Sequence, residues 1–187
     1  MTKMLLVPVP SEIMVFAYFK KLSASQKRIY RKSDEISGIP LPHAHALHPA
    51  VEDLRRALER EDRDTVEDAC RQIALGVVER LNAPRLRVRV LAVRPSASWG
   101  ELHGLYEPAE GRASALITLW MRTAKQRRAV AFRAFLRTLL HELCHHLDYE
   151  HFRLADSFHT EGFYKRESSL FHQLVGDAIE QHAGRSR

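Results

Sequence analysis

His141-Glu142-Leu143-Cys144-His145 follows an apolar run, residues 129–140, that contains neither glycine nor proline. Apolar side chains recur in this run at helical spacing, which predicts one long helix over residues 125–151. Two histidines four residues apart lie on one helical face, with about 5–6 Å between their Cβ atoms, so both can bind one metal ion. The pattern H-E-x-x-H is typical of zinc sites whose glutamate acts as a base toward water. We therefore expect His141 and His145 to bind Zn²⁺ and Glu142 to be catalytic.

Two histidines leave such a site one protein ligand short, because catalytic zinc usually has three and keeps one position for water. His151 has the spacing of H-E-x-x-H-x-x-G-x-x-H, but Asp148 stands where that pattern has glycine. Glu161 or Glu167 could supply a carboxylate ligand instead. His159 is the best candidate, because the loop before it is long enough to turn back and a glycine and an aromatic residue follow it.

The character of the chain changes near residue 85. Residues 1–84 predict helices, which we interpret as an accessory segment packed on the core, and residues 85–187 predict strands followed by two helices. The order indicates an α+β fold in which a small antiparallel sheet packs on the metal-binding helix. Helices are expected over residues 11–22, 23–32, 49–60, 64–81 and 162–182, besides the metal helix, and strands over 85–93, 102–106 and 114–121.

The stretch from Ile117-Thr-Leu-Trp120 through His141-Glu-Leu-Cys-His-His-Leu-Asp148 to His159-Thr-Glu-Gly-Phe163 resembles a SprT-like metallopeptidase domain of the zincin fold. The resemblance covers about residues 85–180. It implies a zincin-like arrangement, one zinc ion held by His141, His145 and His159, and hydrolysis of peptide bonds. It also implies that the strand at 114–121 presents an edge to which an extended peptide adds. Some members degrade proteins crosslinked to DNA, but the cysteine-rich zinc ribbon of some members is absent here.

Several neighbours of the motif have two interpretations each. Asp148 lies on roughly the same helical face as His141 and could orient a ligand histidine, or could cap the helix or form a surface ion pair. Tyr164 and Arg166 are candidates for stabilising an oxyanion, although a packed aromatic ring and a surface arginine are the more ordinary interpretations. His146 is rotated off the metal face and is expected to be exposed to solvent.

The net charge of the chain is compatible with more than one kind of binding partner. The chain has 187 residues, a formal net charge of +6 and a pI near 9.6, which permits binding to nucleic acid. We favour instead the interpretation that the densest basic stretch is a solvated helix face. This stretch contains Arg122, Lys125, Arg127, Arg128, Arg133 and Arg137.

The remaining histidines and the cysteines give weaker signals. Cys70 and Cys144 are too few for a disulfide framework, and we expect both to lie in helices. His43, His45 and His48 lie in a proline-bounded loop and are interpreted as surface residues. The chain lacks the charge order of a secretory signal and any long apolar span, so a cytoplasmic location is expected.

The sequence therefore predicts a zinc-dependent endopeptidase that acts on protein or peptide substrates. The alternative is a non-catalytic, zinc-bearing regulatory or nucleic-acid-associated module with the same fold. A zinc hydrolase acting on a non-peptide bond is a third hypothesis. An intact Glu142 favours an enzyme, because a purely structural zinc site has no need for a base. The sequence does not indicate the oligomeric state.

Overall fold

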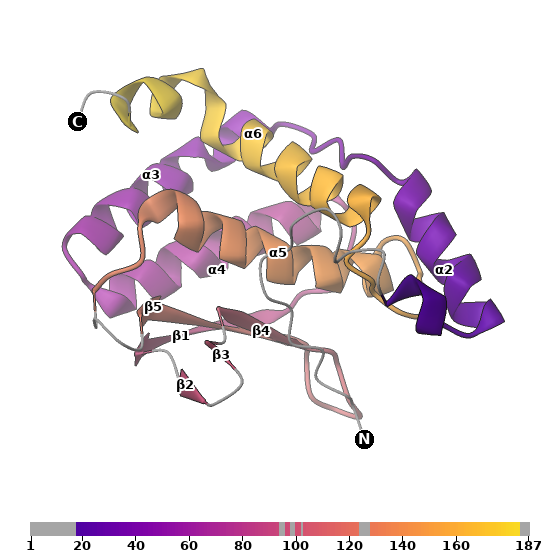
Figure 1. Ribbon diagram of the computed structural model, residues 1–187. Coiled ribbons are helices and arrows are strands. Elements are labelled where there is room, and N and C mark those ends of the chain that lie inside the picture. The colour runs from indigo at the N-terminus through magenta and orange to yellow at the C-terminus, as the bar shows by residue number, and fades with distance from the viewer. Residues whose placement is uncertain (1–17, 94–95, 98–99, 102, 124–127, 184–187) are drawn as a thin grey trace.

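The computed structural model describes residues 18–93, 96–97, 100–101, 103–123 and 128–183. Helices and strands form a mixed α+β structure, as predicted (Figure 1). The helices are α2 (Ala24–Glu35), α3 (His48–Glu59), α4 (Arg63–Arg80), α5 (Phe132–Glu150) and α6 (Glu161–Ala183), with 3-10 turns η1 (Phe19–Lys21) and η2 (Ala44–Leu47). The strands are β1 (Arg87–Val93), β2 (Ser96–Ala97), β3 (Gly100–Glu101), β4 (Gly104–Glu107) and β5 (Leu116–Arg122).

The three-stranded sheet has the order β1-β5-β4 and is mixed, so the prediction of an antiparallel sheet is wrong for one of its two strand pairs. β4 runs antiparallel to β5, whereas β1 runs parallel to it. A parallel pair needs a long crossover, and the segment between Val93 and Leu116, which includes the β2–β3 pair and β4, provides one. The sequence pattern defines strands but not the path between them.

β5 is the central strand, so the expectation that it presents a free edge is also wrong. Thr118 is paired with Arg89 of β1 on one side and with Leu105 of β4 on the other. The edges of this sheet are β1 and β4. α5 crosses one face of the sheet and contacts both β4 and β5, as the orange helix in Figure 1 shows.

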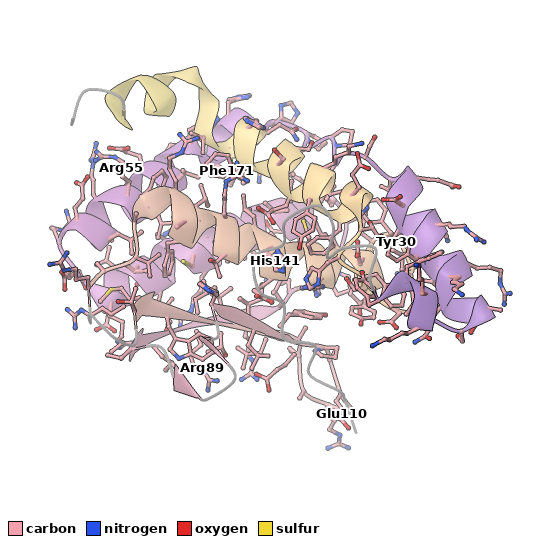
Figure 2. The ribbon with its side chains drawn as sticks, in the orientation of Figure 1. Tyr30, Arg55, Arg89, Glu110, His141 and Phe171 are labelled. Carbon is pink, nitrogen blue, oxygen red and sulfur yellow. The ribbon has the colours of Figure 1, made fainter. Side chains whose placement is uncertain are left out.

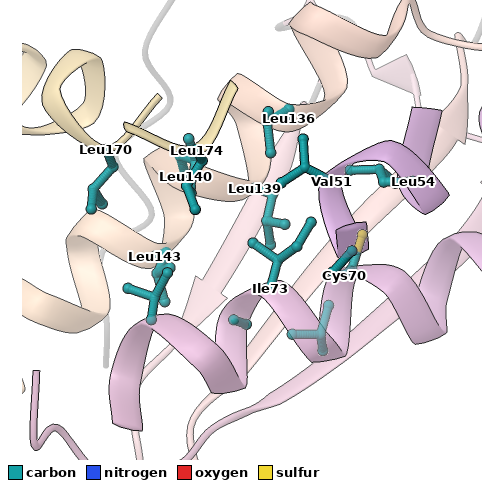
Figure 3. Close-up of a cluster of buried hydrophobic side chains, with 14 of the residues drawn as sticks. Val51, Leu54, Cys70, Ile73, Leu136, Leu139, Leu140, Leu143, Leu170 and Leu174 are labelled. Carbon is teal, nitrogen blue, oxygen red and sulfur yellow. The ribbon is translucent and has the colours of Figure 1, made fainter. Parts of the chain in front are cut away.

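One hydrophobic core joins the N-terminal helices to the sheet and to the metal helix. α3 and α4 pack against each other, and α4 also packs on β1. The two helices α3 and α4 each contact α5, and α6 contacts α5 and α3. Both cysteines are buried, Cys70 in α4 and Cys144 in α5. Figure 3 shows where these helices meet, through Val51, Leu54, Cys70, Ile73, Leu136, Leu139, Leu140, Leu143, Leu170 and Leu174.

The N-cap residues of two helices can be compared with the predicted helix starts. Ser23 begins α2 as predicted, in a capping box with Gln26. α4 is capped by Asp62, which accepts from the Thr65 amide, and not by Asp64. Most of the helix predicted over residues 11–22 lies outside the described residues, and Phe19–Lys21 form a 3-10 turn.

The metal helix begins at Phe132, later than the predicted start near residue 125. The amide of Val130 donates to the carbonyl oxygen of Met121, and Ala129 forms a bridge with Arg122, so the chain after β5 first pairs back on that strand. Residues 124–127 lie outside the described part of the chain. Within the described residues, no helix is long and apolar enough to span a bilayer.

Candidate metal centre

Three histidine side chains converge where α5 lies beside the loop that leads to α6. His141 and His145 are one helical turn apart on α5, and His159 lies in the loop just before α6. The Nε2 atom of His159 lies 2.9 Å from Nε2 of His141 and 3.1 Å from Nε2 of His145. Figure 2 labels His141 on α5, and its side chain is 25% exposed. Among the described residues, these are the side chains placed to hold a metal ion.

The loop before His159 folds back because its backbone bonds to the end of the metal helix. The amides of Phe152 and Leu154 donate to the carbonyl oxygens of Leu147 and Asp148. Arg153 adopts a left-handed conformation, with φ of 54°, where the chain reverses. The loop therefore brings a residue fourteen positions after His145 back onto the same helical face.

The tautomer of His145 follows from its neighbours. Its Nδ1 atom lies 2.7 Å from the hydroxyl oxygen of Ser157, and that hydroxyl donates to a carboxylate oxygen of Asp148 at 2.8 Å. A serine hydroxyl has one hydrogen, so Ser157 must accept from Nδ1–H of His145. The Nε2 atom of His145 is then unprotonated and presents its lone pair to the other histidines.

His141 is oriented in the same way by a different group. Its Nδ1 atom lies 3.1 Å from a carboxylate oxygen of Glu167, which accepts a hydrogen bond and leaves Nε2 of His141 unprotonated. Arg137 donates to the other oxygen of Glu167 at 3.2 Å. Glu167, one of the candidate third ligands, therefore contacts Nδ1 of His141 and not the Nε2 side that faces the other histidines.

The spacing of the three nitrogens is compatible with one tetrahedral zinc ion. Ligand nitrogens at about 2.0–2.1 Å from zinc in tetrahedral geometry lie roughly 3.3 Å apart. The two distances from His159 are 2.9 and 3.1 Å, and the ligand atoms of all three histidines lie within 4.8 Å of one another. Two of the three Nε2 atoms present lone pairs, and a single Nε2–H on His159 could only share its one hydrogen between them. A cation at the centre of the three nitrogens would instead accept a lone pair from each. The donor set therefore fits a zinc ion.

Burial favours the neutral form of two of the three histidines, His145 and His159, by lowering their pKa values. It lowers the pKa of His159 to about 3, and the neighbouring His141 lowers it further. Burial also lowers the pKa of His145 well below its usual value, with added repulsion from His159 and His141. Neutral imidazole is the form that binds metals, so the site holds two of its ligands ready at neutral pH.

Glu142 lies between α5 and the edge strand β4, where it is 8% exposed. Its carboxylate accepts a hydrogen bond from the amide of Tyr106, and burial raises its pKa to about 7. Gly104 allows this close approach, because a Cβ atom there would lie 2.5 Å from a carboxylate oxygen of Glu142. A carboxylate with this pKa can accept and release a proton near neutral pH.

The structure places the other proposed ligands away from the trio. Glu161 is exposed and forms an ion pair with Lys165. His151 uses its Nδ1 atom on the carbonyl oxygen of Leu81, at 3.0 Å. His48, expected in a loop, is the first residue of α3 and contacts the carbonyl oxygen of Gln173.

Two side-chain predictions near the motif are wrong. His146 is buried, with Nε2 on the carbonyl oxygen of Pro84 and Nδ1 beside the hydroxyl of Tyr106. Arg166 is fully buried beside Asp148 and is not a surface residue. Asp148 orients His145 through Ser157, a residue that the sequence analysis missed. The sequence signal for Ser157 as a partner of His145 is its position two residues before His159.

Comparisons of the chain with known protein families, with curated proteins and with solved structures give no match.

Proposed function

We propose that this protein is a zinc-dependent endopeptidase. The observation that carries the proposal is the convergence of three Nε2 atoms, two with their lone pairs fixed by Ser157 and Glu167, beside the buried carboxyl of Glu142. This combination is that of a hydrolytic zinc site with three protein ligands and a separate base. The resemblance of the same residues to a SprT-like, zincin-fold metallopeptidase points to peptide bonds as the substrate class.

Zinc, when bound, polarises a carbonyl oxygen and makes water more acidic. Glu142 takes the proton from the attacking water and delivers it to the leaving amine, for which a pKa of about 7 is suited. The Tyr106 amide holds the carboxylate in place from β4. Because Tyr106 and Gly104 both adjoin Glu142, the β4 edge is where an extended substrate would add as a further strand, close to the base.

The contacts of the basic stretch do not favour nucleic acid as the main ligand. Arg122 forms an ion pair with Glu61, and Arg137 forms one with Glu167 while lying over the ring of Phe171. These two guanidinium groups are engaged within the protein. Lys125 and Arg127 lie outside the described residues.

The test combines zinc content with hydrolysis of an unfolded, fluorescently labelled protein. The wild-type chain is expected to contain about one zinc ion and to cleave the substrate. Glu142→Gln should keep the zinc and lose cleavage, because the amide cannot accept a proton. His159→Ala should lose zinc or bind it much more weakly, since it removes one of three ligands.

His151→Ala is the matched control, because His151 lies near the motif but contacts the carbonyl oxygen of Leu81 and the ring of Phe152 instead of the three histidines. It should keep both zinc and cleavage. A wild-type protein that binds no zinc would overturn the proposal. Zinc binding without cleavage, or cleavage that survives Glu142→Gln, would instead favour the non-catalytic zinc module or another mechanism.

A further inference from the structure

Arg166 is a fully buried arginine that joins the N-terminal helix α2 to the metal helix. Its guanidinium donates to the carbonyl oxygens of Ser33 and Ile36, at 2.6 and 2.7 Å, and to the Ser33 hydroxyl at 2.9 Å. On its other side it donates to Asp148 of α5 at 2.8 Å, and both side chains of this pair are 0% exposed. One cation therefore satisfies the last turn of α2 and a buried carboxylate together.

The contacts continue from Asp148 to the metal-facing nitrogen. The second carboxylate oxygen of Asp148 accepts from Ser157, which accepts from Nδ1–H of His145. The resulting chain of hydrogen bonds runs from α2 through Arg166, Asp148 and Ser157 to His145. Hydrogen bonds behind a ligand histidine fix its ring orientation and raise its basicity.

The same turn of α2, residues 33–36, also contacts the loop that carries His159. The Asp34 carboxylate accepts from the amide of Gly162 at 2.8 Å, and the Ser33 hydroxyl lies 3.4 Å from that of Thr160. Gly162 is packed so tightly that an added Cβ atom would lie 2.5 Å from the Asp34 carbonyl oxygen. This turn is therefore connected by hydrogen bonds to His145 and to the segment that carries His159.

We propose that the α2 C-terminal turn (residues 33–36) is a positioning element of the metal site, so that docking of α2 and binding of zinc stabilise each other. This inference rests on the proposed metal site but not on peptidase activity. Thermodynamic reciprocity requires that whatever weakens docking of the turn weakens zinc binding, and that zinc in turn strengthens docking. The N-terminal segment then controls the site and is more than an accessory cover.

The first measurement is the zinc dissociation constant, obtained by competition with a chelator. Ser157→Ala breaks the chain next to the ligand and should weaken zinc binding by about 10–100-fold. Ser157→Thr retains a hydroxyl and should restore most of the affinity. The visible spectrum of the cobalt-substituted protein should change in the alanine variant and return toward the wild-type spectrum in the threonine variant, which general destabilisation would not produce.

The second measurement tests α2 itself. Ser33→Ala removes a partner of both Arg166 and Thr160, and it should weaken zinc binding by roughly 5-fold or more, the lower end of typical coupling effects. Glu35→Ala is the matched control, because Glu35 is exposed on the same turn, and it should bind zinc normally. Zinc should also slow hydrogen exchange of the amides in this turn, and less so in Ser157→Ala.

These outcomes separate the inference from the proposed function. Equal zinc affinity for wild type, Ser33→Ala and Glu35→Ala, with exchange in α2 unaffected by zinc, would overturn the coupling while leaving the metal site intact. A zinc-binding protein that cleaves no peptide but shows the coupling would support the inference and contradict the peptidase proposal. A wild-type chain without zinc affinity would overturn both.

Discussion

The two edges of the three-stranded sheet each place a backbone amide on a glutamate from a neighbouring helix. At the β1 edge, the amide of Val90 donates to Glu67 of α4 at 2.7 Å. At the β4 edge, the amide of Tyr106 donates to Glu142 of α5. In both places the carboxylate accepts from one outward-facing amide of an edge strand, a single group that would otherwise be available to another strand.

The charges around the two carboxylates differ. Glu67 forms ion pairs with Arg63 and Arg71, and Arg63 also donates to the carbonyl oxygen of Val90, so this edge is closed by a neutralised group. Glu142 is buried beside His141, and burial raises its pKa to about 7. The same contact between an amide and a carboxylate therefore stabilises the β1 edge, where arginines neutralise Glu67. Among the described residues no arginine forms an ion pair with Glu142, and its raised pKa makes this carboxyl group able to exchange a proton near neutral pH.

Replacing Gly104 with alanine should have the largest effect on this comparison. The added Cβ atom would lie 2.5 Å from the Oε1 atom and 2.7 Å from the Cγ atom of Glu142, so the base must move. We expect kcat/KM for peptide cleavage to fall by roughly 100-fold, as for other small displacements of catalytic groups. Zinc content should stay near the wild-type value, because the three histidines are not displaced.

Gly38→Ala is the control for Gly104→Ala. Its Cβ atom would meet the Ser169 hydroxyl at 3.5 Å, an ordinary contact, and activity should be retained. Full activity in Gly104→Ala would show that the position of Glu142 against β4 is unimportant for catalysis.

Glu67→Ala tests the closed edge, and its effect should be on stability. The Val90 amide would lose its acceptor, and an unsatisfied buried donor costs about 1–3 kcal/mol in the free energy of unfolding. Denaturant titration measures this loss, and activity per folded molecule should not change. An unpaired Val90 amide at this edge strand should also increase aggregation at high concentration.

Asp68→Ala separates the edge contact from surface electrostatics. Asp68 also pairs with Arg71, but its side chain is 64% exposed. Surface ion pairs contribute about 0–1 kcal/mol, so this variant should be nearly as stable as wild type. Equal losses in the two variants would mean that the loss arises from Arg71 and not from the edge of β1.

The three histidines could be predicted from their spacing along the sequence. H-E-x-x-H needs only helical periodicity to bring His141 and His145 together, and the apolar run upstream predicts that helix. His159 was placed by a loop of suitable length and by a resemblance, and the structure brings it within 3.1 Å of both partners. These inferences depend on spacing along the chain, which a sequence shows directly.

The rest of the site depends on contacts between distant segments. Ser157 matters because the loop after α5 folds back, and Arg166 is buried because α2 ends against it. Neither residue has a periodic pattern that shows its partner. The parallel pairing of β1 with β5 has the same origin, because strand patterns predict burial but not the route of the connection.

The smallest expected effect at the β4 edge concerns the hydroxyl of Tyr106. His146 donates from Nε2 to the Pro84 carbonyl oxygen at 2.8 Å, so its Nδ1 atom accepts from the Tyr106 hydroxyl at 3.2 Å. That hydroxyl is therefore committed to the fold. Tyr106→Phe should cost about 0.5–1.5 kcal/mol of stability, and zinc affinity and kcat should change little.

Tyr106→Phe also tests which part of Tyr106 acts at the site. The backbone amide that holds Glu142 and the ring that stacks near His145, with centroids 6.5 Å apart, both remain in the variant. A large fall in kcat with zinc retained would mean that the hydroxyl leaves His146 to stabilise the developing oxyanion. Unchanged kcat with a lower unfolding free energy would assign the catalytic contribution of β4 to its backbone and to Gly104, because those are the groups that touch the base.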